Sequence, residues 1–157
     1  MIVWYAAGAI LAVWIVFQST GLDFRFVAAG GLVPLFDSLV GHQAVMHSLL
    51  APTLAMTAVM AITAGRGRRL LRRRLIGLPI GWYFGLALAG AFAHRAVFWF
   101  PAFGLDFGAV AVWPPLPWAL GLEIAGLFAL RTIWSRAGLG DPANRAAFVR
   151  DGRLDLP

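Results

Sequence analysis

The sequence predicts an all-α integral membrane protein, a small bundle of about five transmembrane helices. Three observations lead to this fold class: 61% of the 157 residues are hydrophobic, only 13% are charged, and the mean hydropathy is +0.79. A soluble domain carries about 25% charged residues, and a chain of this length buries only part of its surface on folding. The composition therefore excludes a soluble enzyme. It also excludes a disordered chain, which needs low hydrophobicity and high charge.

Apolar segments give the expected order of the spans. We expect membrane-spanning helices over 2–18, 26–41, 44–64, 75–93 and 118–134, because each segment is near the length that a bilayer requires. The second segment is the shortest and contains Gly and Pro, so a re-entrant segment with four spans is the alternative there. The two arrangements place the N-terminus on opposite sides. Residues 1–134 would form the transmembrane domain and 135–157 a polar cytoplasmic tail.

Arginine sets the expected orientation. The chain has 13 basic residues, all of them Arg, and most lie in 65–74 and 131–153, beside apolar runs. Positive loops stay in the cytoplasm, so we expect the 65–74 loop and the C-terminus to be cytoplasmic in a bacterial inner (plasma) membrane. The lipid bilayer is then the main partner, with anionic lipids near Arg66–Arg74. The same distribution argues against nucleic acid as a partner, despite a pI near 11.5.

Ionisable residues inside the predicted membrane region are the candidate functional residues. Asp37, His42, His47, His94 and Glu123 would all lie in its outer part, where such groups are costly. A break in the backbone would turn the first three toward one point. Carboxylate and imidazole ligands suit zinc or manganese, and a bound metal generates a hydroxide nucleophile. Asp37, His42 and His47 are therefore candidate metal ligands, and Glu123 is a candidate general base.

Each of these residues also has a structural interpretation. An intramembrane His commonly bonds a neighbouring helix, and Asp37 has the chemistry of a helix cap. Glu123 is placed to bond a neighbouring helix or to pair with Arg95. A proton pathway is a third interpretation, but a relay needs ionisable groups across the full membrane thickness. The sequence alone does not separate these alternatives.

Gly77, Gly81 and Gly85 recur at four-residue spacing within one apolar segment. Small residues at this spacing let two helix backbones approach closely. The sequence therefore predicts that this segment packs tightly against another helix.

The stretch LDFRFVAAGGLVPLFDSLVGHQAVMHSLLAP, with its paired-His motif HQAVMHSLL at 42–50, resembles a family of bacterial membrane-bound, metal-dependent hydrolases. The best-known member of that family is LexA-regulated. The resemblance covers roughly residues 20–104 and includes the basic loop and the Phe-Trp-x-Pro stretch. It implies a metal-dependent hydrolase acting on an ester or phosphoester of a lipid-like substrate at the outer face.

Several positions depart from the pattern of that family. Leu35 stands where the family has its first Asp, and Ser38 where it has a His. On the later helix, Gly85 and Ala89 replace the His and Asp of the family. These losses favour an alternative function, a non-catalytic membrane scaffold or an accessory subunit with a membrane-protein partner.

Overall fold

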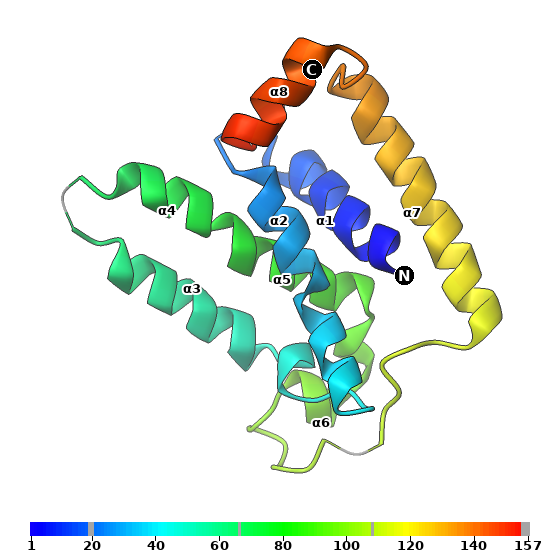
Figure 1. Ribbon diagram of the computed structural model, residues 1–157. Helices are drawn as coiled ribbons and strands as arrows, with labels where there is room; N and C mark the ends of the chain where they lie inside the picture. Colours follow the sequence, from blue (N-terminus) through cyan, green and yellow to red (C-terminus); the bar gives the residue numbers. More distant parts are fainter. Residues whose placement is uncertain (19–20, 66, 108, 155–157) are drawn as a thin grey trace.

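The computed structural model describes residues 1–18, 21–65, 67–107 and 109–154, and every regular element within these ranges is helical (Figure 1). The α-helical part of the fold prediction is therefore confirmed for the described chain. Short 3-10 helices (η) interrupt the α-helices. In chain order the elements are α1 (Ile2–Phe17), α2 (Phe24–Leu32), η1 (Val33–Leu39), η2 (Val45–His47), α3 (Leu50–Ile62), α4 (Arg69–Leu75), α5 (Gly77–Leu88), η3 (Ala91–Ala93), α6 (Arg95–Phe98), α7 (Leu116–Arg136) and α8 (Pro142–Asp151).

Helices α1, α2 and α5 form the centre of the fold, and α7 packs along α1 (Figure 1). The main apolar cluster joins α1, α2 and α7 through buried side chains such as Val13, Val27 and Ile133. The chain after α7 belongs to the same cluster, because Leu139 and Leu154 are also buried in it. Burial of this apolar surface is the main stabilising contribution to the arrangement.

Glycine residues bring α2 and α5 into backbone contact. A Cβ on Gly85 would lie 2.7 Å from the carbonyl oxygen of Gly31, and one on Gly81 would collide with the carbonyl of Val27. A Cβ on Gly77 would lie 2.9 Å from the carbonyl oxygen of Asp23. The predicted tight packing of the 77–81–85 face is confirmed, with α2 as its partner.

The prediction of a five-span bundle is wrong, and its four-span alternative fails for the same reason. Within the described ranges only α7, with 21 residues, is long and apolar enough to cross a membrane. The next longest apolar helices, α1 and α3, have 16 and 13 residues. At about 1.5 Å per residue, these reach only about 24 Å and 20 Å.

Backbone breaks inside the apolar segments explain the difference. The 26–41 segment leaves α-helical geometry at Val33, next to Pro34, whose missing N–H ends the α-helical bonding pattern. The 44–64 segment begins with η2 and becomes α-helical only at Leu50. The 75–93 segment ends its helix before Gly90, which has a φ of 65°. The apolar composition continues through all three breaks. The apolar segments are therefore longer than the helices that form within them.

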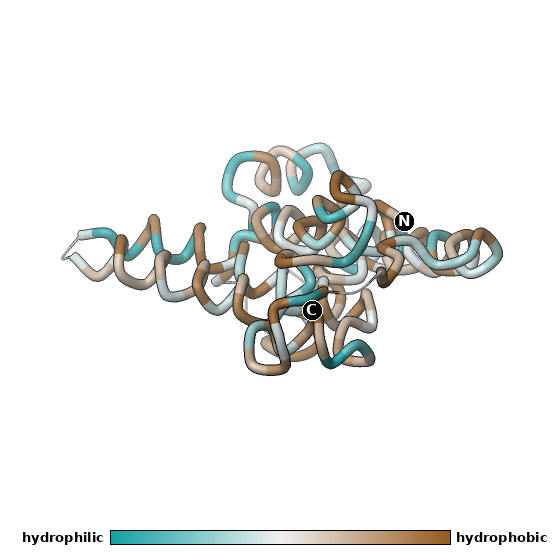
Figure 2. Tube along the Cα trace, turned by 90° about the horizontal axis from the view of Figure 1, so that it is seen from below, coloured by the Kyte–Doolittle hydropathy of each residue, from teal (hydrophilic) through white to brown (hydrophobic). Residues whose placement is uncertain are grey.

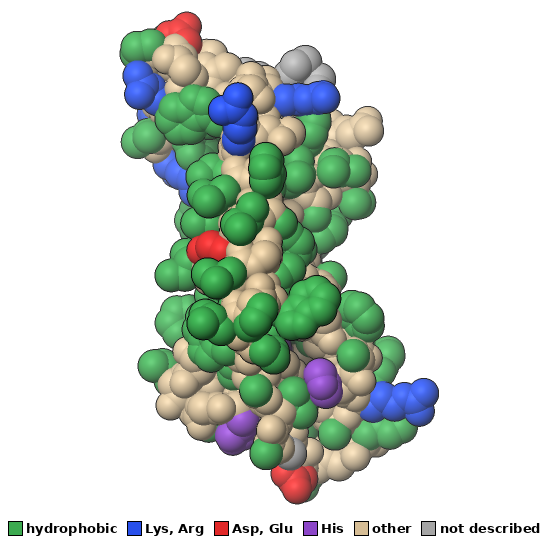
Figure 3. Space-filling view, turned by 90° about the vertical axis from the view of Figure 1, so that its right-hand side faces the viewer, with side chains coloured by type: hydrophobic (Ala, Val, Ile, Leu, Met, Phe, Trp, Pro, Cys, Tyr) green, Lys and Arg blue, Asp and Glu red, His purple; other side chains and the backbone are tan. Residues whose placement is uncertain are grey.

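Large apolar side chains remain exposed on the outside of the fold. Helix α7 and the hairpin of α3 and α4 project on opposite sides of the centre (Figure 2). Hydrophobic side chains cover the middle of the face that includes α7, and arginines lie toward its ends (Figure 3). On α7 itself, Trp118 is 71% and Phe128 66% exposed. This surface has the pattern of a lipid or helix contact, apolar in the middle and charged at the ends.

Candidate functional site

Asp37 and His47 form a buried pair beneath the turn that joins η1 to α3. Asp37 Oδ2 lies 2.7 Å from His47 Nδ1 and accepts hydrogen bonds from the backbone N–H groups of Ala44 at 2.7 Å and His47 at 3.1 Å. Its Oδ1 accepts a fourth hydrogen bond from the N–H of Met46 at 3.3 Å. One carboxylate therefore organises the whole turn, as buried polar groups require partners.

The hydrogen bonds keep this carboxylate ionised. Burial raises the pKa of Asp37, but the hydrogen bonds that it accepts from the His47 ring and from the backbone N–H groups of Ala44 and Met46 outweigh that effect. The net effect lowers the pKa of Asp37 below its ordinary value.

The other ring nitrogen of His47, Nε2, has no hydrogen-bond partner among the described residues. The side chain is fully buried, and no hydrogen bond to Nε2 is found in the described part of the chain. With the Nδ1–H donated to Asp37, Nε2 carries a bare lone pair. Trp82 on α5 donates its indole N–H to the carbonyl of Met46 at 2.9 Å, and this hydrogen bond ties the turn to α5.

His42 does not join the pair. Its Nδ1 lies 3.0 Å from the carbonyl oxygen of the next residue, Gln43, and its side chain is half-buried. Gly41, with a φ of 86°, supplies the backbone break that the sequence suggested. The break brings Asp37 to His47, whereas it leaves the ring of His42 against its own backbone.

Glu123 lies on α7 and caps the first turn of α1. Its carboxylate accepts hydrogen bonds from the N–H groups of Val3 at 3.2 Å and Trp4 at 3.4 Å, and pairs with the Met1 amine at 3.0 Å. The first N–H groups of a helix have no partner within the helix, and a carboxylate is favourable there. Of the alternatives predicted from the sequence, Glu123 therefore has the structural one, in which it bonds a neighbouring helix. Its ionic partner is the Met1 amine and not the predicted Arg95.

His94 lines a pocket of about 350 Å³ beside the start of α1, together with Tyr5, Gln43 and Trp113. Sequence reasoning missed Gln43, which is 4% exposed and whose Oε1 finds no hydrogen-bond partner in the described part of the chain. Its side-chain amide donates to the carbonyl of Ala111 at 3.2 Å. A lone Gln gives no signal in a sequence, because its role depends on a loop far along the chain.

The residues present do not fit the metal site that the resemblance implies. No group of three His, Asp or Glu side chains is placed to hold a metal within 1–18, 21–65, 67–107 and 109–154. The oxygens of Asp37 are already occupied by four donors. At the His position of the family, Gly85 leaves no room for a side chain, because its α-carbon faces the backbone of Gly31.

Comparisons with protein-family models, with curated proteins and with solved structures found no match. The resemblance to the membrane-bound hydrolases therefore stays a prediction from short motifs.

Proposed function

We propose that this chain is a non-catalytic helical scaffold or accessory subunit that associates with a bilayer through α7 and binds a membrane-protein partner. The observation that carries the proposal is the use of the resembled metal-site positions for packing. Asp37 is saturated by the turn that it organises, and Gly85 serves the contact between α2 and α5. Both residues therefore support the fold, and neither is left free to take part in a reaction.

The exposed apolar surface supports the same proposal. Helix α7 is long and apolar enough to cross a membrane, yet only 17% of its apolar window is buried within the fold. In a bilayer, lipid covers such a face, and neighbouring helices compete for it through close packing. A scaffold needs a surface of this kind.

A second candidate function is hydrolysis of a lipid-like ester or phosphoester, and one observation favours it. A metal-binding His commonly donates one ring N–H to a carboxylate and binds the metal through the other nitrogen. His47 has this arrangement, with Asp37 at Nδ1 and an unpartnered Nε2. A metal at His47 would need ligands beyond the Asp37–His47 pair, since the described chain has no cluster of three possible metal ligands.

A pair of substitutions at His47 separates the two functions. His47→Asn keeps an N–H near the position of Nδ1 and removes Nε2, whereas His47→Gln keeps a polar atom near Nε2 and loses the bond to Asp37. The metal content of the chain, purified in mild detergent without chelator, is measured beside its melting temperature. For a scaffold we expect no stoichiometric zinc or manganese, a near-parental melting temperature for His47→Asn and a lower one for His47→Gln.

One metal per chain in the parent, lost in His47→Asn, would overturn the scaffold proposal and support the hydrolase. The partner is tested separately by gentle solubilisation and size-exclusion chromatography. We expect a second membrane protein to co-elute in a fixed ratio with the parent. A monomer that carries metal would contradict the proposal.

A further inference from the structure

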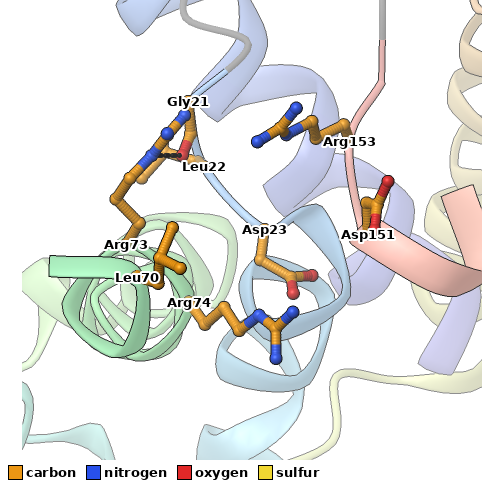
Figure 4. A pocket seen from close by; sticks show the side chains of 8 residues that line it. All are labelled: Gly21, Leu22, Asp23, Leu70, Arg73, Arg74, Asp151 and Arg153. Atoms are coloured by element: carbon orange, nitrogen blue, oxygen red, sulfur yellow. Dashed lines mark hydrogen bonds between the residues drawn. The ribbon is translucent and has the colours of Figure 1, made fainter. Parts of the chain in front are cut away.

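A small pocket lies where α4, the start of α2 and the end of α8 meet (Figure 4). Its volume is about 120 Å³, which corresponds to roughly four water molecules at about 30 Å³ each. Arg73 and Arg74 line it from α4, and Arg153 lines it from the chain after α8. Two carboxylates, Asp23 and Asp151, also line it. The pocket is large enough for a small oxyanion but much smaller than the sites of drug-size ligands.

Both carboxylates already have cationic partners outside this group of arginines. Asp23 binds the guanidinium of Arg25 through both oxygens, at 2.9 Å and 2.6 Å. Asp151 pairs with Arg150 at 3.1 Å, and that hydrogen bond is the main reason that the pKa of Asp151 is lowered. The positive charges of the three lining arginines are therefore left in excess.

The arginines differ in how they are held. Arg73 donates from Nε to the carbonyl oxygen of Gly21 at 3.1 Å, which orients its guanidinium beside the pocket. Arg74 and Arg153 make no hydrogen bond that the described chain shows, although the charge of each acts on Asp151. Figure 4 shows their side chains extending toward the pocket from either side of Asp23. Their N–H donors are available to a ligand.

Backbone contacts place Arg153 at the pocket. The carbonyl of Gly152 accepts a hydrogen bond from the N–H of Phe24 at 2.8 Å. Gly152 itself has a φ of 67° and lies against Asp23, a position with no room for a Cβ. Arg25 also donates to the carbonyl of Val149. The end of α8 is thus fixed on the start of α2, so that Arg153 meets the arginines of α4 without further ordering.

We propose that this pocket binds the phosphate group of a mono- or diester, either a lipid headgroup or a soluble phosphate. Arginine is the side chain best suited to a phosphate, because its fork of N–H groups pairs with two oxygens at once. The proposal assigns this role to two arginines of the 65–74 run and to one from the far end of the chain. It differs from the expectation that the whole Arg66–Arg74 run contacts anionic lipid, and Arg66 lies outside the described residues.

The test is a thermal melt of the full chain in a neutral detergent, followed by circular dichroism. Two probes are titrated: sodium phosphate, against sodium chloride at equal ionic strength, and phosphatidylglycerol, against phosphatidylcholine. A ligand that binds only the folded state raises the melting temperature in a saturable way. We expect this rise in the parent, and in Arg74→Gln/Arg153→Gln we expect the half-saturating concentration to increase about tenfold or more.

The matched control is Arg69→Gln/Arg145→Gln, which removes the same charge at two positions outside the pocket, one on α4 and one on α8, the helix that Arg153 follows. We expect it to respond like the parent. A response to phosphatidylglycerol alone identifies a lipid headgroup, and a response to sodium phosphate identifies a soluble phosphate. The proposal fails if neither probe gives a saturable rise, or if the control loses the response as fully as the pocket variant. Melting temperatures of both variants equal to that of the parent, without probe, show that the fold is intact.

Discussion

Asp37 and His47, ten residues apart in the chain, meet at 2.7 Å in the interior of the protein. Their contact closes a turn whose backbone N–H groups also bind the same carboxylate. The turn carries the chain from η1 into α3 and positions the carbonyl of Met46 for the indole of Trp82. The pair is therefore the structural centre of the segment on which the functional alternatives depend.

Acid should weaken this turn. The folded pKa of Asp37 is lowered, so its ionised form stabilises the protein above the unfolded pKa of about 3.9. That stabilisation is lost as the pH falls through the lower folded pKa. We expect Asp37→Asn to lower the free energy of unfolding by about 1.5–3 kcal/mol at neutral pH. The difference from the parent should shrink as the pH falls below about 4, as thermal melts at decreasing pH would show. A constant difference down to the lowest pH would contradict the assignment.

Trp82→Phe tests the support of the turn from α5. The indole N–H donates to the carbonyl of Met46 at 2.9 Å, and the side chain is 8% exposed. Loss of this bond leaves a carbonyl without its partner, so we expect a loss of about 1–3 kcal/mol in the free energy of unfolding. Trp118→Phe is the control, because that indole is 71% exposed, and it should change stability little.

Gly85→Ala tests the backbone contact between α2 and α5. The added Cβ would lie 2.7 Å from the carbonyl oxygen of Gly31, so the helices must move apart. We expect a loss of about 1–3 kcal/mol, as for other overpacked interiors. Gly121→Ala on α7 meets nothing within 4 Å and should stabilise its helix by up to about 1 kcal/mol. Thermal melts of both variants measure the contrast, and similar behaviour would argue against the contact.

Phe128→Arg tests whether α7 lies in lipid. This side chain is 66% exposed on the apolar helix, and an arginine in the middle of a bilayer span costs about 2.5–3.5 kcal/mol. We expect less of the variant to remain in the membrane pellet after alkaline carbonate extraction. Val149→Arg on α8, at a side chain 69% exposed, is the matched control and should stay with the parent. Equal extraction of both would place α7 outside the lipid.

Glu123 offers a test of the contact between α7 and α1. Glu123→Gln keeps an oxygen for the N–H groups of Val3 and Trp4 but loses the charge that faces the Met1 amine. Glu123→Ala removes every contact. We expect the alanine variant to melt at the lower temperature, with a loss of about 0.5–2 kcal/mol typical of a helix cap. Parental stability in both variants would contradict the capping role of Glu123.

The sequence predicted the elements that depend on local pattern. Helical structure, the glycine face of α5 and a backbone break near Gly41 are all present. The meeting of Asp37 and His47 follows from that break, since five or ten residues along one continuous helix would not align these side chains. The sequence predicted this approach as part of a metal site that also included His42, and the metal-ligand role of these residues stays a prediction.

Helix lengths and distant partners could not be predicted in the same way. Hydropathy averages over a window, whereas Pro34 and Gly90 end helices at single residues without changing the apolar character. The partners of Glu123 and Gln43 lie 120 and 68 residues away, so only the packed fold reveals them. The predicted meeting of His42 with Asp37 fails because its ring turns to the carbonyl of Gln43.

The packing of α1 against α7 also sets an order of events during synthesis. A Cβ on Gly126 of α7 would lie 2.5 Å from the backbone nitrogen of Trp4 on α1, so the two helices are in intimate contact. The roughly 100 residues between them take about 5–20 s to translate. For that time only the side of α1 that packs against α7 lacks its native cover, because α2 and α5 pack against its other sides. Until α7 has been made, lipid or a chaperone must therefore cover that one side of α1.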